Sequence, residues 1–184
     1  WDGMVNARSP RCLDLRRIVM ANPMYGQNKF DDSVDGKIGI VEHVKPAADG
    51  TVASPTKTLV KGDSGNYYIV DISANTAAFV LPSAALAKGA IFTFILGVES
   101  DAEGTKDLII ASAAATEFLM GVGIDAGVVH DQQSDDDQIT IDTSAGAAGA
   151  GDRIQVLCDG HHWYVLDASA LSSGAFVSGT ATRS

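Results

Sequence analysis

The sequence predicts an all-β protein, built as a single antiparallel β-sandwich or small barrel of about seven to nine short strands with an extended N-terminal arm. From Thr58 onward, short runs rich in Val, Ile, Phe, Tyr and Thr alternate with turns that contain Gly, Asp, Asn or Pro. No stretch shows the spacing of a long amphipathic helix. This disfavours a parallel sheet built from strand–helix–strand units.

The composition indicates a folded, acidic protein. The chain has 184 residues, of which 46% are hydrophobic, so one domain with its own core is available. No apolar run is long enough to cross a bilayer. The formal net charge of −10 disfavours nucleic-acid binding, which depends on Lys and Arg contacts to phosphates. We therefore expect neither a membrane nor a nucleic acid as partner.

Residues 1–19 differ in character from the sequence that follows. They hold four of the thirteen basic residues, and Met20 then opens the sequence MANPMYGQNKFDD, which is typical of a protein start. The pair Arg16-Arg17 can be encoded by a bacterial ribosome-binding sequence just upstream of the Met20 codon. We expect the protein to begin at Met20 and residues 1–19 to be a non-native or untranslated upstream leader; the alternative is a short basic N-terminal arm.

Residues 20–57 are predicted to form an extended N-terminal arm. Pro23, Pro46 and Pro55, with several glycines and scattered charges, make a long helix unfavourable. Within the arm, Lys37–Val44 is expected to form one short strand. Arms of this kind have little fold of their own and order by lying on another surface.

The predicted β domain spans residues 58–170. A short strand begins at Thr58, and the turn Gly62–Gly65 separates it from the next strand. Small helix formers and a terminal glycine predict one helical turn over Ser83–Gly89. The remaining runs of the first half predict three strands, of which the mostly apolar last one is expected to be central: Tyr67–Ile72, Ala77–Pro82 and Ala90–Val98.

The second half continues in the same way. Three further strands are predicted: Leu108–Ala113, Glu117–Ile124 with glycines that allow a bulge, and the alternating Gln138–Ser144. The acidic residues 125–138 are expected to be a solvated loop, and residues 145–152 a flexible turn. Residues 171–184 are small and polar, and we expect a C-terminal tail with Phe176 as its only large anchor.

A β-hairpin is predicted within residues 151–170. Its strands, Arg153–Cys158 and Trp163–Leu166, flank an Asp-Gly dipeptide that favours hairpin turns. The loop is expected to exceed two residues because two histidines precede Trp163. Trp163 is large enough to fill the core, and its indole N–H then needs a hydrogen-bond partner.

Two clusters have the composition of metal sites. His161 and His162 follow Asp159, but neighbouring strand residues point to opposite faces, which favours ordinary loop residues. Asp131 and Asp135–Asp137 offer the oxygen ligands that calcium takes. The glycine and closing glutamate of an EF-hand loop are missing, so an exposed charged loop is the favoured interpretation.

Other motifs of enzymes and metal proteins are incomplete. Ser64 lies in a GDSG sequence, as protease nucleophiles do, but the only preceding histidine is His43, which leaves no room for the first barrel of such a protease. Residues 146–152 lack the Lys-Ser/Thr ending of a phosphate loop. Cys12 and Cys158 do not form a zinc ligand set, and Cys158 is expected to be a small buried residue.

The aromatic residues are interpreted first as core or cross-strand pairs and only second as a sugar-stacking surface. They lie at strand spacing: Tyr67, Tyr68, Phe92 and Phe94. Taken together, the motifs predict no catalytic residue, no cofactor and no metal site, and therefore no enzyme.

Three blocks in order resemble a known family. They are KGDSGNYYIVDIS, FVLPSAALAKGAIFTFIL and GDRIQVLCDGHHWYVL. In this order and spacing they are similar to small β-sandwich virion structural proteins of marine tailed phages, cyanophages in particular. The resemblance covers most of residues 58–166, and residues 20–32 also resemble the N-terminus of such proteins. Each block alone has low specificity, whereas the ordered set is moderately specific.

The resemblance implies a structural role in a virion. It points to a capsid decoration (cement) protein on the outer surface of a phage head, with the major capsid protein as partner and a homo-oligomer, favoured as a trimer, as the assembled form. The N-terminal arm would contact the capsid through Tyr25, Asn28, Lys29 and Phe30; the alternative is that these residues cover an edge of the protein's own domain. The alternative is a tail or head fibre module that recognises a host surface glycan.

Overall fold

The computed structural model describes these stretches of the chain: residues 40–98, 104–126, 128–132, 136–143, 148–170, 175–179 and 181–183. Residues Asp35–Ser184 belong to one compact unit. Strands dominate the described stretches, in which the helical pieces are one α-helical turn (α1, Ala84–Ala87) and one 3-10 turn (η2, Lys61–Asp63). The predicted all-β class and the predicted helical turn are therefore confirmed.

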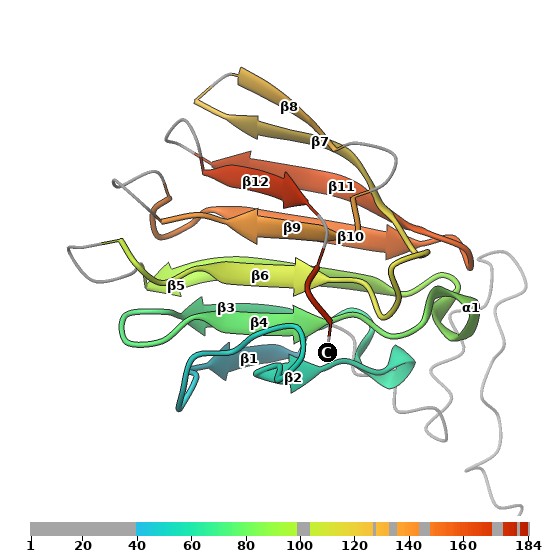
Figure 1. The fold of residues 1–184 in the computed structure, drawn as a ribbon, viewed down its shortest axis with the longest axis horizontal. Coiled ribbons are helices and arrows are strands. Elements are labelled where there is room, and N and C mark those ends of the chain that lie inside the picture. Colours follow the sequence, from blue (N-terminus) through green and yellow to red (C-terminus); the bar gives the residue numbers. More distant parts are fainter. Residues whose placement is uncertain are drawn as a thin grey trace, which may run out of the picture. The chain divides into compact units, whose positions relative to one another are not determined.

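Within these residues, twelve strands form two sheets (Figure 1). The seven-stranded sheet has the order β1-β3-β5-β10-β11-β7-β8. Its strands are Val41–Val44 (β1), Tyr67–Asp71 (β3), Ile91–Val98 (β5), Arg153–Cys158 (β10), Trp163–Ala170 (β11), Leu119–Asp125 (β7) and Val128–Gln132 (β8). The five-stranded sheet has the order β12-β9-β6-β4-β2, with strands Phe176–Gly179 (β12), Gln138–Ile141 (β9), Leu108–Ala111 (β6), Ala77–Val80 (β4) and Lys57–Thr58 (β2).

Both sheets are mixed, which differs from the antiparallel arrangement of seven to nine strands that we predicted. Strands β1, β3 and β5 run parallel, as do β2, β4 and β6, and β11 runs parallel to β7. Parallel neighbours require a crossover connection, which is most often a helix. Here, from β1 to β6, the chain alternates between the two sheets, so each crossover is a strand of the other sheet.

One hydrophobic core contains side chains from both sheets. Phe79 of β4 packs against Tyr68 of β3 and Phe94 of β5, with ring centroids 5.4 and 5.0 Å apart. Trp163 of β11 is fully buried and packs against Phe92 of β5. Strand alternation explains this distribution, because every second residue of a strand faces the same side.

The closing hairpin is confirmed. Strands β10 and β11 are antiparallel, and Cys158 pairs with Trp163 across the loop Asp159–His162, which is longer than two residues as predicted. A register shift lies between Gln155 and Val156, where the pairing with β11 is irregular. On its other side β10 pairs with β5, which is therefore an inner strand of the sheet.

The prediction of a solvated acidic loop at 125–138 is wrong. Val128–Gln132 forms β8, which pairs antiparallel with β7 after a turn at Ala126. Asp136 and Asp137 are buried. The acidic composition led us to predict a loop where a strand forms. This strand is stabilised by its pairing with β7, and the polarity of its side chains does not indicate that pairing.

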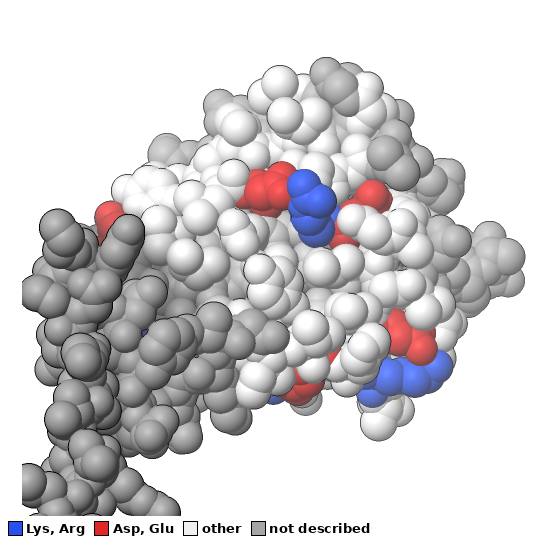
Figure 2. Space-filling view, turned by 180° about the vertical axis from the view of Figure 1, so that it is seen from behind, with Lys and Arg blue, Asp and Glu red and all other residues white. Residues whose placement is uncertain are grey.

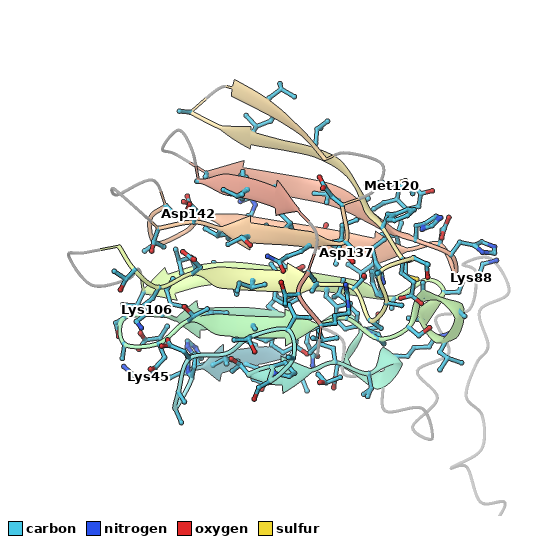
Figure 3. All side chains as sticks on the ribbon, in the orientation of Figure 1. Lys45, Lys88, Lys106, Met120, Asp137 and Asp142 are labelled. Carbon is cyan, nitrogen blue, oxygen red and sulfur yellow. The ribbon has the colours of Figure 1, made fainter. Side chains whose placement is uncertain are left out.

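The chain on both sides of the predicted domain also takes part in the sheets. Val41–Val44, predicted within the arm, pairs with β3, and Phe176–Gly179, predicted as tail, pairs with β9. Asp137 then holds the residues beyond β12 (Figure 3). The Ala181 N–H donates to Asp137 Oδ1 at 2.6 Å, and the Arg183 guanidinium lies 2.5 Å from Asp137 Oδ2.

In the described part of the chain, helices are too short or too polar to form a bilayer span.

Candidate functional site

The arm residues predicted to touch a capsid lie outside the described part of the chain: Tyr25, Asn28, Lys29 and Phe30. The site described below is therefore built from the sheets.

The histidine cluster at the hairpin loop is a structural feature. Asp159 Oδ1 accepts the backbone N–H groups of His161 and His162 at 2.7 and 2.8 Å, and these bonds lower the pKa of Asp159. His162 Nδ1 accepts the N–H of Phe118 at 3.2 Å, and the two rings stack with centroids 5.3 Å apart. Among the described residues, no three His, Cys, Asp or Glu side chains form a group able to hold a metal.

Ser64 and the described part of the acidic cluster also have structural roles. Ser64 Oγ accepts the N–H of Ile91 at 3.0 Å, which ties the GDSG turn to the start of β5. Of the acidic cluster, Asp137 is buried in the ion pair with Arg183, whereas the side chain of Asp131 and all of Asp135 lie outside the description. Burial raises the pKa of the Cys158 thiol, in agreement with its predicted place in the core.

The aromatic residues divide between core and surface. Tyr68, Phe92, Phe94 and Trp163 are fully buried, whereas Tyr67 is 41% exposed. Burial raises the pKa of Tyr68 to about 12. The interpretation as core side chains is therefore confirmed for all except Tyr67, which points away from the core because it alternates with Tyr68.

The most distinctive surface of the described residues is the outer face of the seven-stranded sheet. Exposed large apolar side chains of this sheet include Val41 of β1, Tyr67 of β3, Tyr164 and Leu166 of β11, Val122 and Ile124 of β7, and Val129 of β8. A sheet face open to water is normally polar at alternate positions. The apolar residues on both sides of these strands therefore indicate a surface that another molecule covers.

Among the described side chains of this face, charged groups form two pairs of opposite sign. Lys45 Nζ lies 2.7 Å from Asp71 Oδ2, and Arg153 Nε lies 2.6 Å from Asp167 Oδ2. Figure 2, which views the molecule from behind, shows a largely uncharged surface on which red and blue groups lie close together. The described charges of the face thus cancel locally, although the chain as a whole carries −10.

A shallow hollow of about 280 Å³ lies at one end of this face, over β1, β3 and β5. His43, Lys45 and Asp71 contribute its polar groups. Gly97 forms part of the wall, and a Cβ there would lie 2.5 Å from Ile69 Cγ2, so only glycine fits beside this isoleucine. The hollow is open to solvent and joins the apolar face to the Lys45–Asp71 ion pair.

We expect the Asp71→Asn variant to lose less stability than the wild type when the pH is lowered from about 4 to about 2. Hydrogen bonds from Lys45 and Ser73 lower the pKa of Asp71 from 3.8 to about 2. The folded protein therefore binds fewer protons than the unfolded chain in this interval. The contribution of Asp71 is complete above the unfolded pKa and is lost as the pH falls through the folded pKa.

Urea unfolding of both proteins at several pH values measures this effect. The wild-type curve should fall more steeply below about pH 4 than that of Asp71→Asn. Superimposable pH profiles would contradict the assignment of a stabilising role to the Asp71 carboxylate.

Comparison with known proteins adds no family to this description. No model of a known protein family matches the chain, and no curated protein matches it.

The apolar face was missed by reasoning from the sequence, although its signal is visible there. Runs such as Tyr67–Val70 and Leu119–Ile124 carry apolar residues at both odd and even positions. Strands that are buried on both faces have the same pattern. Only the absence of a second layer over the outer positions of the described sheet distinguishes the two cases.

Proposed function

We propose that this protein is an architectural component of a tailed-phage virion, a capsid decoration protein that binds the outer surface of the head and stabilises it. The observation that carries the proposal is the exposed apolar face, whose described charges form the ion pairs Lys45–Asp71 and Arg153–Asp167, on an acidic protein. Such a face is typical of assembly surfaces. The residues that suggested chemistry, Ser64 and His162, instead tie loops to strands.

We also propose that the two sheets pack as a β-sandwich, the architecture that the sequence resemblance implies. The shared core supports this proposal, since Phe79 of one sheet contacts Tyr68 and Phe94 of the other. A rigid two-sheet unit suits a role in which a protein must keep its shape on the surface of a particle.

In the proposed mechanism, several copies, favoured as a trimer, bind the major capsid protein together. Each copy lays its N-terminal arm on a neighbouring capsid subunit through residues that include Tyr25 and Phe30. Weak contacts then combine, because each bound copy raises the effective concentration of the next arm. The acidic charge supports display on an outer surface and opposes a role in contact with the genome.

A fibre module that recognises a host surface glycan is the second candidate. Tyr67 and Tyr164 are exposed on the same face, and exposed tyrosines can stack on sugar rings. The burial of Tyr68 and Trp163 counts against this function, because these two aromatic side chains cannot contact a sugar and only Tyr67 and Tyr164 of the four named here are exposed.

The two functions are separated by mixing the full-length protein with undecorated capsids and, separately, with host cells. We expect the protein to sediment with capsids and to remain in solution with cells. A Tyr25→Ala/Phe30→Ala variant should bind capsids less, whereas the matched Leu86→Ala variant, altered at a 75% exposed position of α1, should bind as the wild type does. Sedimentation with cells alone would reject the decoration role.

Stabilisation of the head is tested on particles that lack the protein. These particles should release DNA at a lower temperature than decorated particles, and addition of the purified protein should restore the wild-type temperature. Equal release temperatures with and without the protein would contradict the stabilising role.

A further inference from the structure

The hollow over β1, β3 and β5 lies where the regular pairing of the sheet is interrupted. Asp71 pairs with Val98 after a register shift, so Gly97 is an extra residue of β5, as in a β-bulge. A Cβ at Gly97 would lie 2.5 Å from Ile69 Cγ2, in the wall of the hollow of about 280 Å³. Bulges of this kind are frequent next to active sites. The bulge and the glycine therefore keep this part of the outer face open.

Three polar side chains at the hollow retain hydrogen-bonding capacity. The ammonium of Lys45, which directly follows β1 (Figure 3), has three donors, and two of them bind Asp71 and Ser73. The Asp71 carboxylate has about four lone-pair positions, of which Lys45 occupies one and the N–H and hydroxyl of Ser73 occupy two more. His43 is exposed, and within the described stretches its imidazole has no hydrogen-bond partner. A donor, an acceptor and an imidazole therefore remain for a ligand.

Apolar surface lies beside these polar groups. Ile69 and Val98 line the hollow, and Val98 is 45% exposed. Tyr67 lies two residues before Ile69 on β3, so its side chain is on the same face of the sheet, about 7 Å further along the strand. It is 41% exposed. The hollow thus offers an apolar floor, an accessible aromatic ring nearby and polar groups on one side.

Charge and hydrogen bonding restrict the kind of ligand. Because Lys45 Nζ and Asp71 Oδ2 lie 2.7 Å apart, an ion of either sign is attracted by one group and repelled by the other. An apolar ligand would displace water from the ion pair without replacing its hydrogen bonds. A hydroxyl group both donates and accepts, so one hydroxyl can accept from Lys45 while its neighbour donates to Asp71. A neutral compound with adjacent hydroxyls and an apolar C–H face meets both conditions.

We infer that the hollow binds one ring of a neutral saccharide. Two adjacent hydroxyls contact Lys45 and Asp71, and a third contacts His43. The C–H face of the ring lies on Ile69. The inference goes beyond the proposed function, because it uses residues of β1, β3 and β5 instead of the arm and does not depend on where the protein lies on a particle. An open hollow with few contacts gives only millimolar affinity, so a lone copy of the protein remains in solution with cells.

NMR titration of the isotope-labelled full-length protein tests this inference, with glucose, galactose, mannose and N-acetylglucosamine as probes. At least one sugar should shift the backbone amide signals of Ile69, Asp71 and Gly97 until they saturate. Glycerol, which has adjacent hydroxyls but no ring, should give much smaller shifts, and inorganic phosphate should give none. The inference is overturned if no sugar gives saturable shifts at these residues, if glycerol acts as strongly as the sugars, or if phosphate alone binds.

A pair of histidine variants then assigns the site. His43→Ala should raise the Kd of the bound sugar about fivefold, because it removes one hydrogen bond at an exposed position. The matched control His161→Ala alters an exposed histidine of the β10–β11 loop and should bind the sugar as the wild type does. An unchanged Kd for His43→Ala would place the sugar elsewhere and reject the inference. Sugar binding by a protein that fails to sediment with capsids would reject the proposed function and leave this inference standing.

Discussion

Trp163→Ala is expected to lower the free energy of unfolding by about 4 kcal/mol. The indole is fully buried and packs against Phe92, with ring centroids 5.7 Å apart, in the core that both sheets share. Alanine removes this apolar surface and leaves a cavity, because the strands β7 and β10 on either side of β11 cannot close over it. Urea unfolding followed by circular dichroism measures the loss.

The next residue along the strand provides the matched control. Tyr164 points to the opposite face and is 38% exposed, so Tyr164→Ala should cost less than about 1 kcal/mol. Equal losses for the two variants would show that Trp163 does not fill the core.

A second variant at the same position separates packing from hydrogen bonding. Among the described residues, the indole nitrogen of Trp163 has no hydrogen-bond partner. Trp163→Phe removes that unsatisfied N–H, which offsets part of the lost volume, so its cost should be about 1 kcal/mol. A loss as large as that of Trp163→Ala would indicate that the N–H is in fact paired in solution.

Arg183→Ala is expected to cost about 3 kcal/mol of unfolding free energy, although the residue lies next to the end of the chain. Asp137 is fully buried, and its carboxylate interacts with Arg183 and the Ala181 N–H. Arg183 also donates to the carbonyl oxygen of Ser112 at 3.0 Å. Its removal leaves the buried carboxylate without its cation. The value lies at the low end for buried pairs because the Arg183 side chain stays 24% exposed.

The surface pair Arg153–Asp167 is the control for this prediction. It has similar geometry, at 2.6 Å, but its side chains are 53% and 38% exposed. Arg153→Ala should therefore cost less than about 1 kcal/mol, as exposed ion pairs do. Guanidinium chloride unfolding compares the two variants. A smaller loss of unfolding free energy for Arg183→Ala than for Arg153→Ala would contradict a stabilising role of the Asp137–Arg183 ion pair.

Much of the secondary structure could be predicted because its signals are local. The Asp-Gly dipeptide and the flanking β-formers located the β10–β11 hairpin, and Gly89, at φ 81°, ended the helical turn after α1. Strand β8 was missed because its sequence contains the polar residues His130 and Asp131, which are typical of a loop. The strand is stabilised by its pairing with β7, which the sequence of β8 alone does not show.

The candidate face could be predicted only in part. The sequence shows apolar residues at both odd and even positions of β7, but a strand that is buried on both faces has the same pattern. The ion pair of Asp137 with Arg183 joins residues far apart in the chain, and spacing along the sequence does not predict such a contact.

By itself, the sequence determined that this is an acidic protein of short strands with a large aromatic residue in its closing hairpin, because composition and period-two alternation act over a few neighbouring residues. Only the tertiary structure decided the parallel pairing within both sheets, the burial of Asp137 and the outer position of Leu166 and Ile124. These features depend on which strands become neighbours, and that choice is made by contacts between residues distant in the chain.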